Sequence, residues 1–202
     1  MKTNFLLLLI GLLTAGGQAS ANQSKQQAAL DMIARLGGAS KVDVTLPGKP
    51  IVYVDLHSTA VTDTDLSLLK PLTQLRHLDL RLTKIGDDGV RHLDGLRQLK
   101  FLNLFRTNLS DKGLQELRDL KQLDTLLMGG TKVTDQGLGH LKSFGKLRKI
   151  SVFDTQITDA GISHLSKLPS LEIALVGKSR ITEVGMKALQ LARPGVRFSE
   201  DT

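Results

Sequence analysis

Apolar residues recur along most of the chain with the spacing apolar-x-x-apolar-x-apolar, and this spacing repeats every 24 residues without an insertion. Successive side chains of an extended segment point to opposite faces, so the fourth and sixth places of each copy share one face. The pattern therefore predicts six short strands with one apolar face each. The apolar places are Ile51, Val54, Leu56; Leu75, Leu78, Leu80; Leu99, Leu102, Leu104; Leu123, Leu126, Met128; Leu147, Ile150, Val152; Leu171, Ala174, Val176.

A second pattern lies between these strands: "TAVTDTDLSLL", "TKIGDDGVRHL", "TNLSDKGLQEL", "TKVTDQGLGHL", "TQITDAGISHL" and "SRITEVGMKAL". In the fourth copy we expect Val133 to point into the core and the Thr131 hydroxyl to bond the backbone of the adjacent turn. Thr134 is expected to cap a short helix, with Asp135 placed favourably near its dipole. Gly137 is costly inside a helix, which indicates that neighbouring units pack closely at this place.

A fixed period of this length is typical of a solenoid, in which each unit buries its apolar face against its neighbours. The two patterns resemble the L-x-x-L-x-L and T-x-I-T-D-x-G-L-x-x-L signatures of leucine-rich repeat proteins, in a subtype similar to repeats of secreted bacterial proteins and eukaryotic F-box adaptors. The resemblance covers residues 51–191. It implies an α/β fold, a curved leucine-rich repeat solenoid whose parallel inner strands line a concave face and whose short helices lie on the convex side.

The ends of a solenoid expose core and need caps. The stretch "SKQQAALDMIARLGG", from Ser24, predicts an amphipathic helix that ends at Gly37-Gly38. The alternation of Val42, Val44 and Leu46 predicts a hairpin strand that shields the first repeat. We therefore expect a signal peptide over residues 1–21, an N-terminal cap over 22–50, and repeats with a short C-terminal strand over 51–202.

The first 21 residues have the features of a secretory signal peptide: Lys2, an apolar run from Phe5 to Leu13, and a small-residue ending at Ala19-Ser20-Ala21. The apolar run is too short to cross a bilayer, and the chain has no cysteine to carry a lipid. The sequence therefore predicts an exported protein, periplasmic or extracellular, without a stable membrane anchor.

About 180 residues remain after this segment, enough for one domain with a substantial core. Disulfides cannot contribute to stability because the chain contains no cysteine. The formal net charge is +7 and falls to about +6 without Lys2, which favours anionic partners.

The candidate binding surface is the concave face, onto which the third, fifth, seventh and eighth places of each strand copy project. Four of the six aromatic residues beyond residue 21 fall in these columns. Phe105 and Phe153 lie two units apart, roughly 10 Å at strand spacing, and we expect them to wall a shallow slot over Gly129-Gly130. The alternative is that the aromatic rings pack edge to edge and hold no ligand. The predicted partner-binding residues are Tyr53, His77, Arg81, Phe101, Phe105, Arg106, Leu127, Gly129, Gly130, Lys149 and Phe153.

The leading functional prediction is a non-enzymatic recognition module that binds a protein or peptide on the concave face, because repeat scaffolds present extended surfaces. The alternative is an anionic envelope polysaccharide or other polyanion, bound through a basic rim that includes Arg76, Lys100 and Arg148. Nucleic acid is not expected as a partner outside the cell, no cofactor is expected, and the sequence indicates no oligomeric state.

Two chemical alternatives, a hydrolase and a metal site, receive little support from the sequence. A hydrolase would need a nucleophile beside its base, but Ser151 and His77 are predicted to lie three strands apart. A zinc ion between His140 and His164 would lack further ligands, and other units place Glu116 and Ala188 in the same column. The sequence therefore predicts neither a catalytic nor a metal site.

Overall fold

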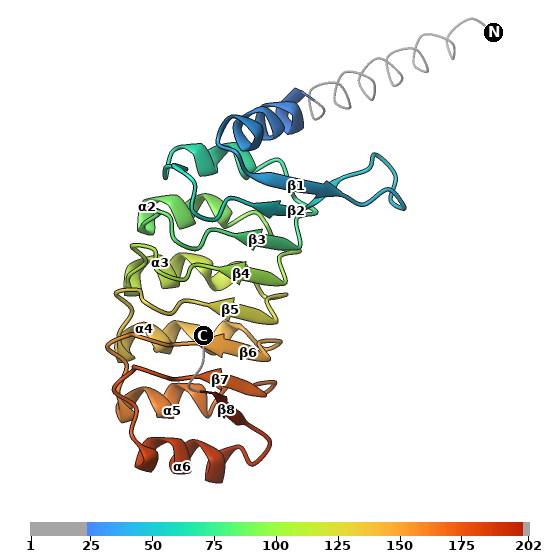
Figure 1. Cartoon of the computed structure of the whole chain (residues 1–202). Coiled ribbons are helices and arrows are strands. Elements are labelled where there is room, and N and C mark those ends of the chain that lie inside the picture. Colours follow the sequence, from blue (N-terminus) through green and yellow to red (C-terminus); the bar gives the residue numbers. More distant parts are fainter. Residues whose placement is uncertain (1–23, 200–202) are drawn as a thin grey trace, which may run out of the picture.

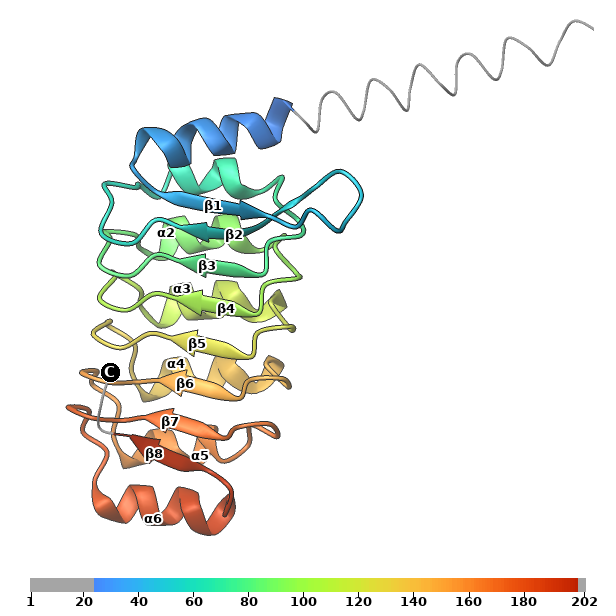
Figure 2. The ribbon, with the colours of Figure 1, turned by 45° about the vertical axis from the view of Figure 1, so that its right-hand side comes forward.

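The structure is a computed structural model that describes residues 24–199, so the signal peptide predicted at residues 1–21 lies outside the described residues. Strands form one layer of the molecule and short helices form the other, and the chain passes from one layer to the other in each repeat (Figures 1 and 2). This is the predicted leucine-rich repeat solenoid. The outer surface of the strand layer, which was predicted to be concave, is called the strand face below.

The sheet follows the order of the chain, from β1 to β8. Its first two strands pair antiparallel, and every later neighbour pairs parallel. The parallel register is constant at the length of the repeat, as in the pairs of Tyr53 with His77 and His77 with Phe101. The strands are β1 (Ala39–Val42), β2 (Ile51–Asp55), β3 (His77–Asp79), β4 (Phe101–Asn103), β5 (Thr125–Leu127), β6 (Lys149–Ser151), β7 (Ile173–Leu175) and β8 (Arg197–Ser199).

The helices on the opposite layer are short, because each unit has only 24 residues for a strand, a helix and two turns. The α-helices that follow the cap are α2 (Asp87–Val90), α3 (Asp111–Glu116), α4 (Asp135–Leu138), α5 (Ile162–Leu165) and α6 (Glu183–Ala192). Short stretches of 3-10 helix extend or replace them: η1 (Asp65–Leu69), η2 (Arg91–Leu93), η3 (Leu117–Asp119), η4 (Gly139–Ser143) and η5 (Asp159–Gly161).

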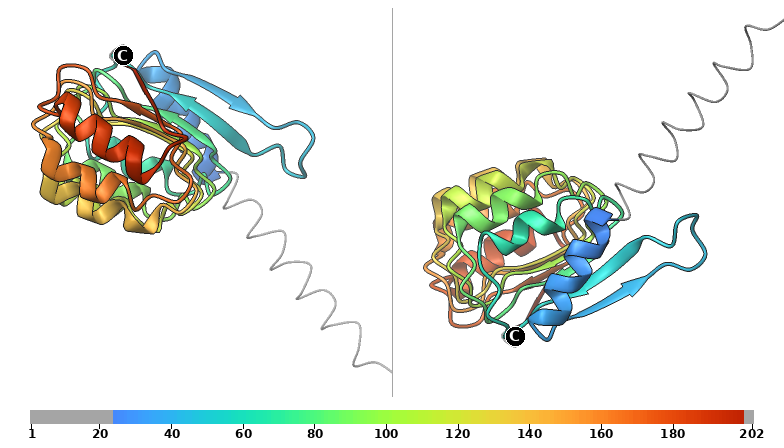
Figure 3. Two further views of the ribbon diagram at one scale, coloured as in Figure 1. Left: turned by 90° about the horizontal axis from the view of Figure 1, so that it is seen from below. Right: turned by 90° about the horizontal axis from the view of Figure 1, so that it is seen from above.

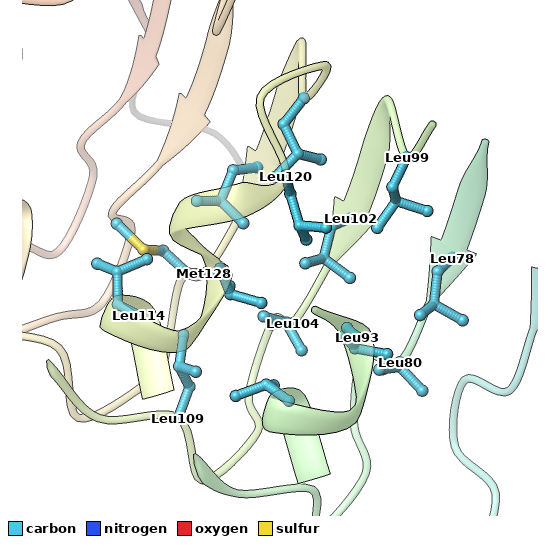
Figure 4. Packing of buried hydrophobic residues seen from close by; sticks show 14 of the residues in the cluster. Leu78, Leu80, Leu93, Leu99, Leu102, Leu104, Leu109, Leu114, Leu120 and Met128 are labelled. Atoms are coloured by element: carbon cyan, nitrogen blue, oxygen red, sulfur yellow. The ribbon is translucent and has the colours of Figure 1, made fainter. Parts of the chain in front are cut away.

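The core is a continuous stack of aliphatic side chains between the two layers (Figure 4). Leu102 and Leu104 of one unit are fully buried beside Leu78 and Leu80 of the preceding unit. The apolar places predicted from the repeat are buried throughout. Each unit therefore packs its leucines against its neighbours, as a solenoid requires.

The hydroxyl that opens each helical stretch bonds the turn after the strand, as the sequence predicted. The Thr131 hydroxyl donates to the carbonyl oxygen of Met128 at 2.6 Å. The same bond to the carbonyl three residues earlier, at 2.5–2.8 Å, is made by Thr59, Thr83, Thr107, Thr155 and Ser179.

The acidic column joins consecutive units, a role that the sequence prediction did not include. Asp111 accepts the backbone N–H of Thr134 at 2.8 Å and its hydroxyl at 2.7 Å, one unit later in the chain. Thr134 makes no side-chain capping bond, contrary to the prediction, whereas Ser110, Thr158 and Thr182 cap their helices. The equivalent clamps join Asp87 to Ser110, Asp135 to Thr158 and Asp159 to Thr182.

The glycine column leaves room for this clamp. A Cβ atom on Gly137 would overlap the carboxylate of Asp111 from the preceding unit. The same overlap would occur with the preceding aspartate at Gly89, Gly113, Gly161 and Gly185. The close packing predicted from the glycines is thus the approach of a carboxylate from the neighbouring unit.

The first unit has no preceding repeat, and its own Asp65 replaces the missing acceptor. Asp65 stands at the glycine place and accepts the backbone N–H and the hydroxyl of Thr62 at 3.0 and 2.7 Å. Its other carboxylate oxygen pairs with Arg35 at 3.0 Å. The clamp is therefore closed at this end by an ion pair with the N-terminal helix.

Two elements cover the start of the solenoid. The N-terminal helix, described over residues 24–35, places Ala29, Met32 and Ile33 in the core. The loop between β1 and β2 projects beyond the edge of the solenoid when the molecule is seen along its axis (Figure 3). Within residues 24–199, no helix has the length and apolar character needed to cross a membrane.

Candidate functional site

Aromatic rings form a continuous stack on the strand face. The register of β2, β3 and β4 places Tyr53, His77 and Phe101 side by side. The ring centroids of Tyr53 and His77 are 4.4 Å apart, and those of His77 and Phe101 are 4.0 Å apart. The His77 and Phe101 rings are nearly parallel, with an interplanar angle of 2°. Lys41 of β1 covers the far side of the Tyr53 ring at 4.8 Å. The rings therefore bury each other's faces and present their edges to the surface.

Burial and the neighbouring charges shift the pKa values of two groups in this stack. Burial lowers the pKa of His77 below its usual value, although the negative charges of Asp79 and Asp55 oppose this effect. Burial also raises the pKa of Tyr53, and the same two carboxylates act in the same direction. Both rings are thus held in their neutral forms near neutral pH.

The prediction of an open slot between Phe105 and Phe153 is wrong. The two ring centroids are 6.3 Å apart and the rings meet at 47°, although their strands are separated by a whole unit. Gly129 has no side chain to hold them apart, and a Cβ at this place would lie 3.0 Å from the Phe105 ring and 2.7 Å from the Phe153 carbonyl oxygen. Phe153 is only 7% exposed, so it belongs to the packing rather than to an open wall.

Two cations lie on this phenylalanine pair. The guanidinium carbon of Arg106 is 5.2 Å from the Phe105 ring centroid, and the ammonium of Lys178 is 5.4 Å from that of Phe153. Arg106 also leans over Gly130, where a Cβ would meet its Cγ atom at 2.6 Å. Neither cation has a carboxylate partner among residues 24–199. They remain positively charged groups at the edge of the strand face.

A polar row crosses the fifth places of the first strands. Asp55 accepts the backbone N–H of His57 at 3.0 Å and approaches its ring Nδ1 at 2.7 Å. Asp79 accepts the backbone N–H of Arg81 at 3.0 Å and lies 3.6 Å from its Nε atom. Burial acts to raise the pKa of Asp55, but the hydrogen bonds from His57 outweigh it and hold that pKa below its usual value.

A pocket of about 520 Å³ opens between this row and the turns after the strands. Arg81, Phe105 and Leu127 of the predicted site line it. The other lining residues were absent from that set: His57, Ser58, Leu82, Asn103, Ser151 and Leu175. All of these lie in the outward-facing columns of the repeat. The sequence therefore indicated that they face outward, but not which of them come together to form a pocket.

The remaining predicted site residues lie outside the pocket lining. Tyr53, His77 and Phe101 form the stack, and Lys149 is half-buried in the same column on β6. Gly129 and Phe153 are buried. The structure thus divides the predicted site into an aromatic stack, a closed phenylalanine pair and a pocket.

The basic rim where the strands begin is largely neutralised. Arg148 makes two hydrogen bonds of 2.8 Å to Glu172, which raise the pKa of the arginine and lower that of the glutamate. Arg76 bonds Asp43 at 3.2 Å. Of the three cations predicted to attract a polyanion at this edge, two therefore have acidic partners.

The histidine column on the helix side contains no cluster of ligands. His164 packs against Gly139, with its Cε1 atom 3.5 Å from the place of a Cβ. The Nδ1 atom of His92 is buried and has no hydrogen-bond partner among the described residues. Within residues 24–199, no group of three or more histidine, cysteine, aspartate or glutamate side chains is placed to hold a metal ion.

Comparisons with known proteins agree with this architecture. The family model described as "Leucine Rich repeat" matches residues 72–93 and 96–117. An internalin from Listeria monocytogenes is similar in structure, with a TM-score of 0.56, 15% identity, and coverage of 84% of this chain and 54% of its own. An internalin C2 from the same organism has a TM-score of 0.50, 22% identity, and coverage of 74% and 81%. The chain spans about half the length of the first of these, and these identities show a shared fold alone. No curated protein matched the sequence.

Proposed function

Because the chain is a leucine-rich repeat protein, we propose that it is a non-enzymatic binding module that holds a protein or peptide on its strand face. The observation that carries the proposal is the pocket of about 520 Å³ beside the aromatic stack. Apolar and polar side chains alternate along its lining, which is the composition of a protein-binding surface. Six stacked units provide a continuous sheet on which an extended partner can lie.

The half-buried residues of the strand face support this assignment. Tyr53, Phe101 and Phe105 keep part of their surface exposed on one side of the molecule. Tyrosine and arginine are enriched among residues that carry binding energy in interfaces, and aromatic residues are enriched in interfaces generally. The alternative partner, a polyanion bound by the basic rim, has less support because Arg76 and Arg148 are already paired with carboxylates.

Site-specific photocrosslinking tests the proposal. A benzoylphenylalanine at Thr125, on the strand face, should form an adduct with a partner in the native host, and one at Gln115, exposed on the helix side, should not. Adducts that form only from Gln115, or equally from both places, would contradict it. A polyanion partner would give no protein adduct, and its affinity would fall steeply with added salt.

We further propose that the chain is exported to the periplasm or the extracellular space, with residues 1–21 as signal peptide, 22–50 as cap and 51–202 as repeats. The charged start, apolar run and small-residue ending before Asn22 support the export signal. Cell fractionation followed by N-terminal sequencing tests it, and the expected first residue of the exported protein is Asn22. Recovery of the protein in the cytoplasm with residues 1–21 still attached would contradict it.

A further inference from the structure

We propose that the pocket on the strand face binds an extended acidic–apolar peptide segment, whose aspartate or glutamate side chain lies against His57 and Arg81 and whose apolar side chains lie against Leu127 and Leu175. The inference rests on the proposed function, since it names the chemistry of the partner at that site. It follows from the positions of the charged and apolar residues in the pocket lining, and from the contacts of His57 and Arg81 with Asp55 and Asp79.

Polar and apolar side chains alternate along the lining, but its imidazole and its guanidinium both lie at one end. His57 and Arg81 belong to the first two units, where the guanidinium of Arg81 provides the cationic hydrogen-bond donor of the lining. Phe105, Leu127 and Leu175 belong to later units and contribute apolar side chains there, interspersed with Asn103 and Ser151. A partner that matches both ends must therefore carry a hydrogen-bond acceptor at one end and apolar groups at the other.

Two carboxylates contact His57 and Arg81: Asp79, which is buried, and Asp55, whose side chain is 19% exposed. Asp55 contacts Nδ1 of His57, which leaves Nε2 facing a ligand, and Nε2 donates to a carboxylate when the ring is an imidazolium. Asp79 fixes the backbone of Arg81, while the Nε contact of 3.6 Å is too long for a hydrogen bond. Among residues 24–199, the Arg81 guanidinium therefore donates no hydrogen bond. Neither aspartate lines the pocket.

This arrangement selects a carboxylate rather than a cation. Because neither aspartate lines the pocket, a ligand there meets the guanidinium and the imidazole rather than the carboxylates. Arg106 and Lys178 add unpaired positive charge at the adjacent edge. A planar guanidinium with free N–H groups is well suited to hold a carboxylate through two hydrogen bonds.

The length of the pocket favours a segment of chain over a small anion. His57 follows β2 and Leu175 lies on β7, five strand spacings away, which is roughly 24 Å. An extended peptide covers this distance with about seven residues. The acid should thus lie about four to six residues from the last apolar contact, and the partner is a protein segment that continues past both ends.

A random heptapeptide library displayed on phage tests the inference. Selection on the purified protein should enrich peptides in which Asp or Glu is separated by four to six positions from Leu, Ile, Val or Phe. The enriched sequence is then synthesised with both termini blocked. Replacement of its acid by the matching amide should weaken binding at least about tenfold, because a charge-assisted hydrogen bond is lost. This change does not alter the protein, so it is independent of folding.

Variants of the protein locate the contact. Arg81→Met, which keeps the aliphatic stem over Asp79, and His57→Ala should each weaken binding of the blocked peptide about tenfold. Arg118→Ala, an exposed arginine on the helix side, should leave it unchanged. The amide form of the peptide should be insensitive to Arg81→Met, since the pairing is then already absent.

Failure of this inference can be told apart from failure of the proposed function. Enriched peptides that need no acid, or that tolerate Arg81→Met, would overturn the acidic–apolar assignment while leaving a binding strand face. A requirement for a free peptide C-terminus would overturn the side-chain carboxylate, and absence of any enriched heptapeptide would overturn the inference as a whole. The photocrosslinking from Thr125 is a separate readout that decides whether the strand face binds a protein.

Discussion

Asp111 and Thr134, 23 positions apart in the chain, are joined by two hydrogen bonds of 2.8 and 2.7 Å, from the threonine backbone and hydroxyl to the two carboxylate oxygens. Because the same pair recurs between most consecutive units, the helix layer is held together by a polar clamp as well as by its leucines. Stability in a solenoid is approximately the sum of such contacts between neighbours.

Removal of the acceptor should weaken the clamp measurably. Asp111→Ala leaves the N–H and the hydroxyl of Thr134 without their partner, and we expect a loss of about 2–3 kcal/mol in the free energy of unfolding. Urea unfolding measures this, with Asp119→Ala, an exposed carboxylate on the same layer, as the control. Thr134→Val should cost much less in the Asp111→Ala background than in the wild type. Additive effects of the two changes would contradict the clamp.

Addition of a methyl group at the glycine column should force the carboxylate out of place. Gly137→Ala is expected to destabilise the protein by about 1–3 kcal/mol, because the new Cβ overlaps Asp111. Gly145→Ala is the matched control, since no atom lies within 4 Å of a Cβ at that place. The cost of Gly137→Ala should largely disappear when Asp111 is also alanine. Equal costs at Gly137 and Gly145 would rule out the steric explanation.

Phe153 should behave as a core residue although it lies on the strand face. Phe153→Ala is expected to reduce stability by about 3 kcal/mol, because the side chain is 7% exposed and packs against Phe105. Arg106→Ala, which removes a cation from the surface of the same pair, should cost less than about 1 kcal/mol. Thermal unfolding of both variants measures the difference. A nearly unchanged melting temperature for Phe153→Ala would support the open slot instead.

The aromatic stack should make stability sensitive to mild acid. The pKa of His77 is lowered in the folded protein, so the neutral ring is favoured by folding. Its contribution is complete above the ordinary histidine pKa of about 6.5 and is lost as the pH falls from there through the lowered value. His77→Phe keeps the stack and removes the titration, so its advantage over the wild type should grow between pH 7 and pH 5. His140→Gln, on the helix side, serves as the control, and a constant difference across this range would contradict the prediction.

Sequence periodicity predicted the architecture because the repeat constrains it unit by unit. The places of Leu102 and Leu104 within a 24-residue period are enough to assign a strand, its buried face and its neighbours. The hydroxyl of Thr131 was equally predictable, because its acceptor lies three residues away in the same turn. The outward columns correctly contained every residue that lines the pocket.

Contacts between units were the part that periodicity could not supply. Asp111 was assigned to its own helix because the repeat alone does not show how closely the next unit approaches. The distance between Phe105 and Phe153 was inferred from strand spacing, yet the rings converge because Gly129 leaves the space between them empty. The pairing of Arg148 with Glu172 likewise depends on side-chain directions in two adjacent strands.

The sequence by itself determined the repeat length, the two layers and the list of outward-facing places, because each depends on local spacing along the chain. Only the tertiary structure decided which of those places meet: the stack of Tyr53, His77 and Phe101, the closed phenylalanine pair, and the pocket of His57 and Arg81. The physical reason is that stacking brings together residues one unit or more apart. The direction and size of each side chain then decide whether it packs, pairs or remains open to a partner.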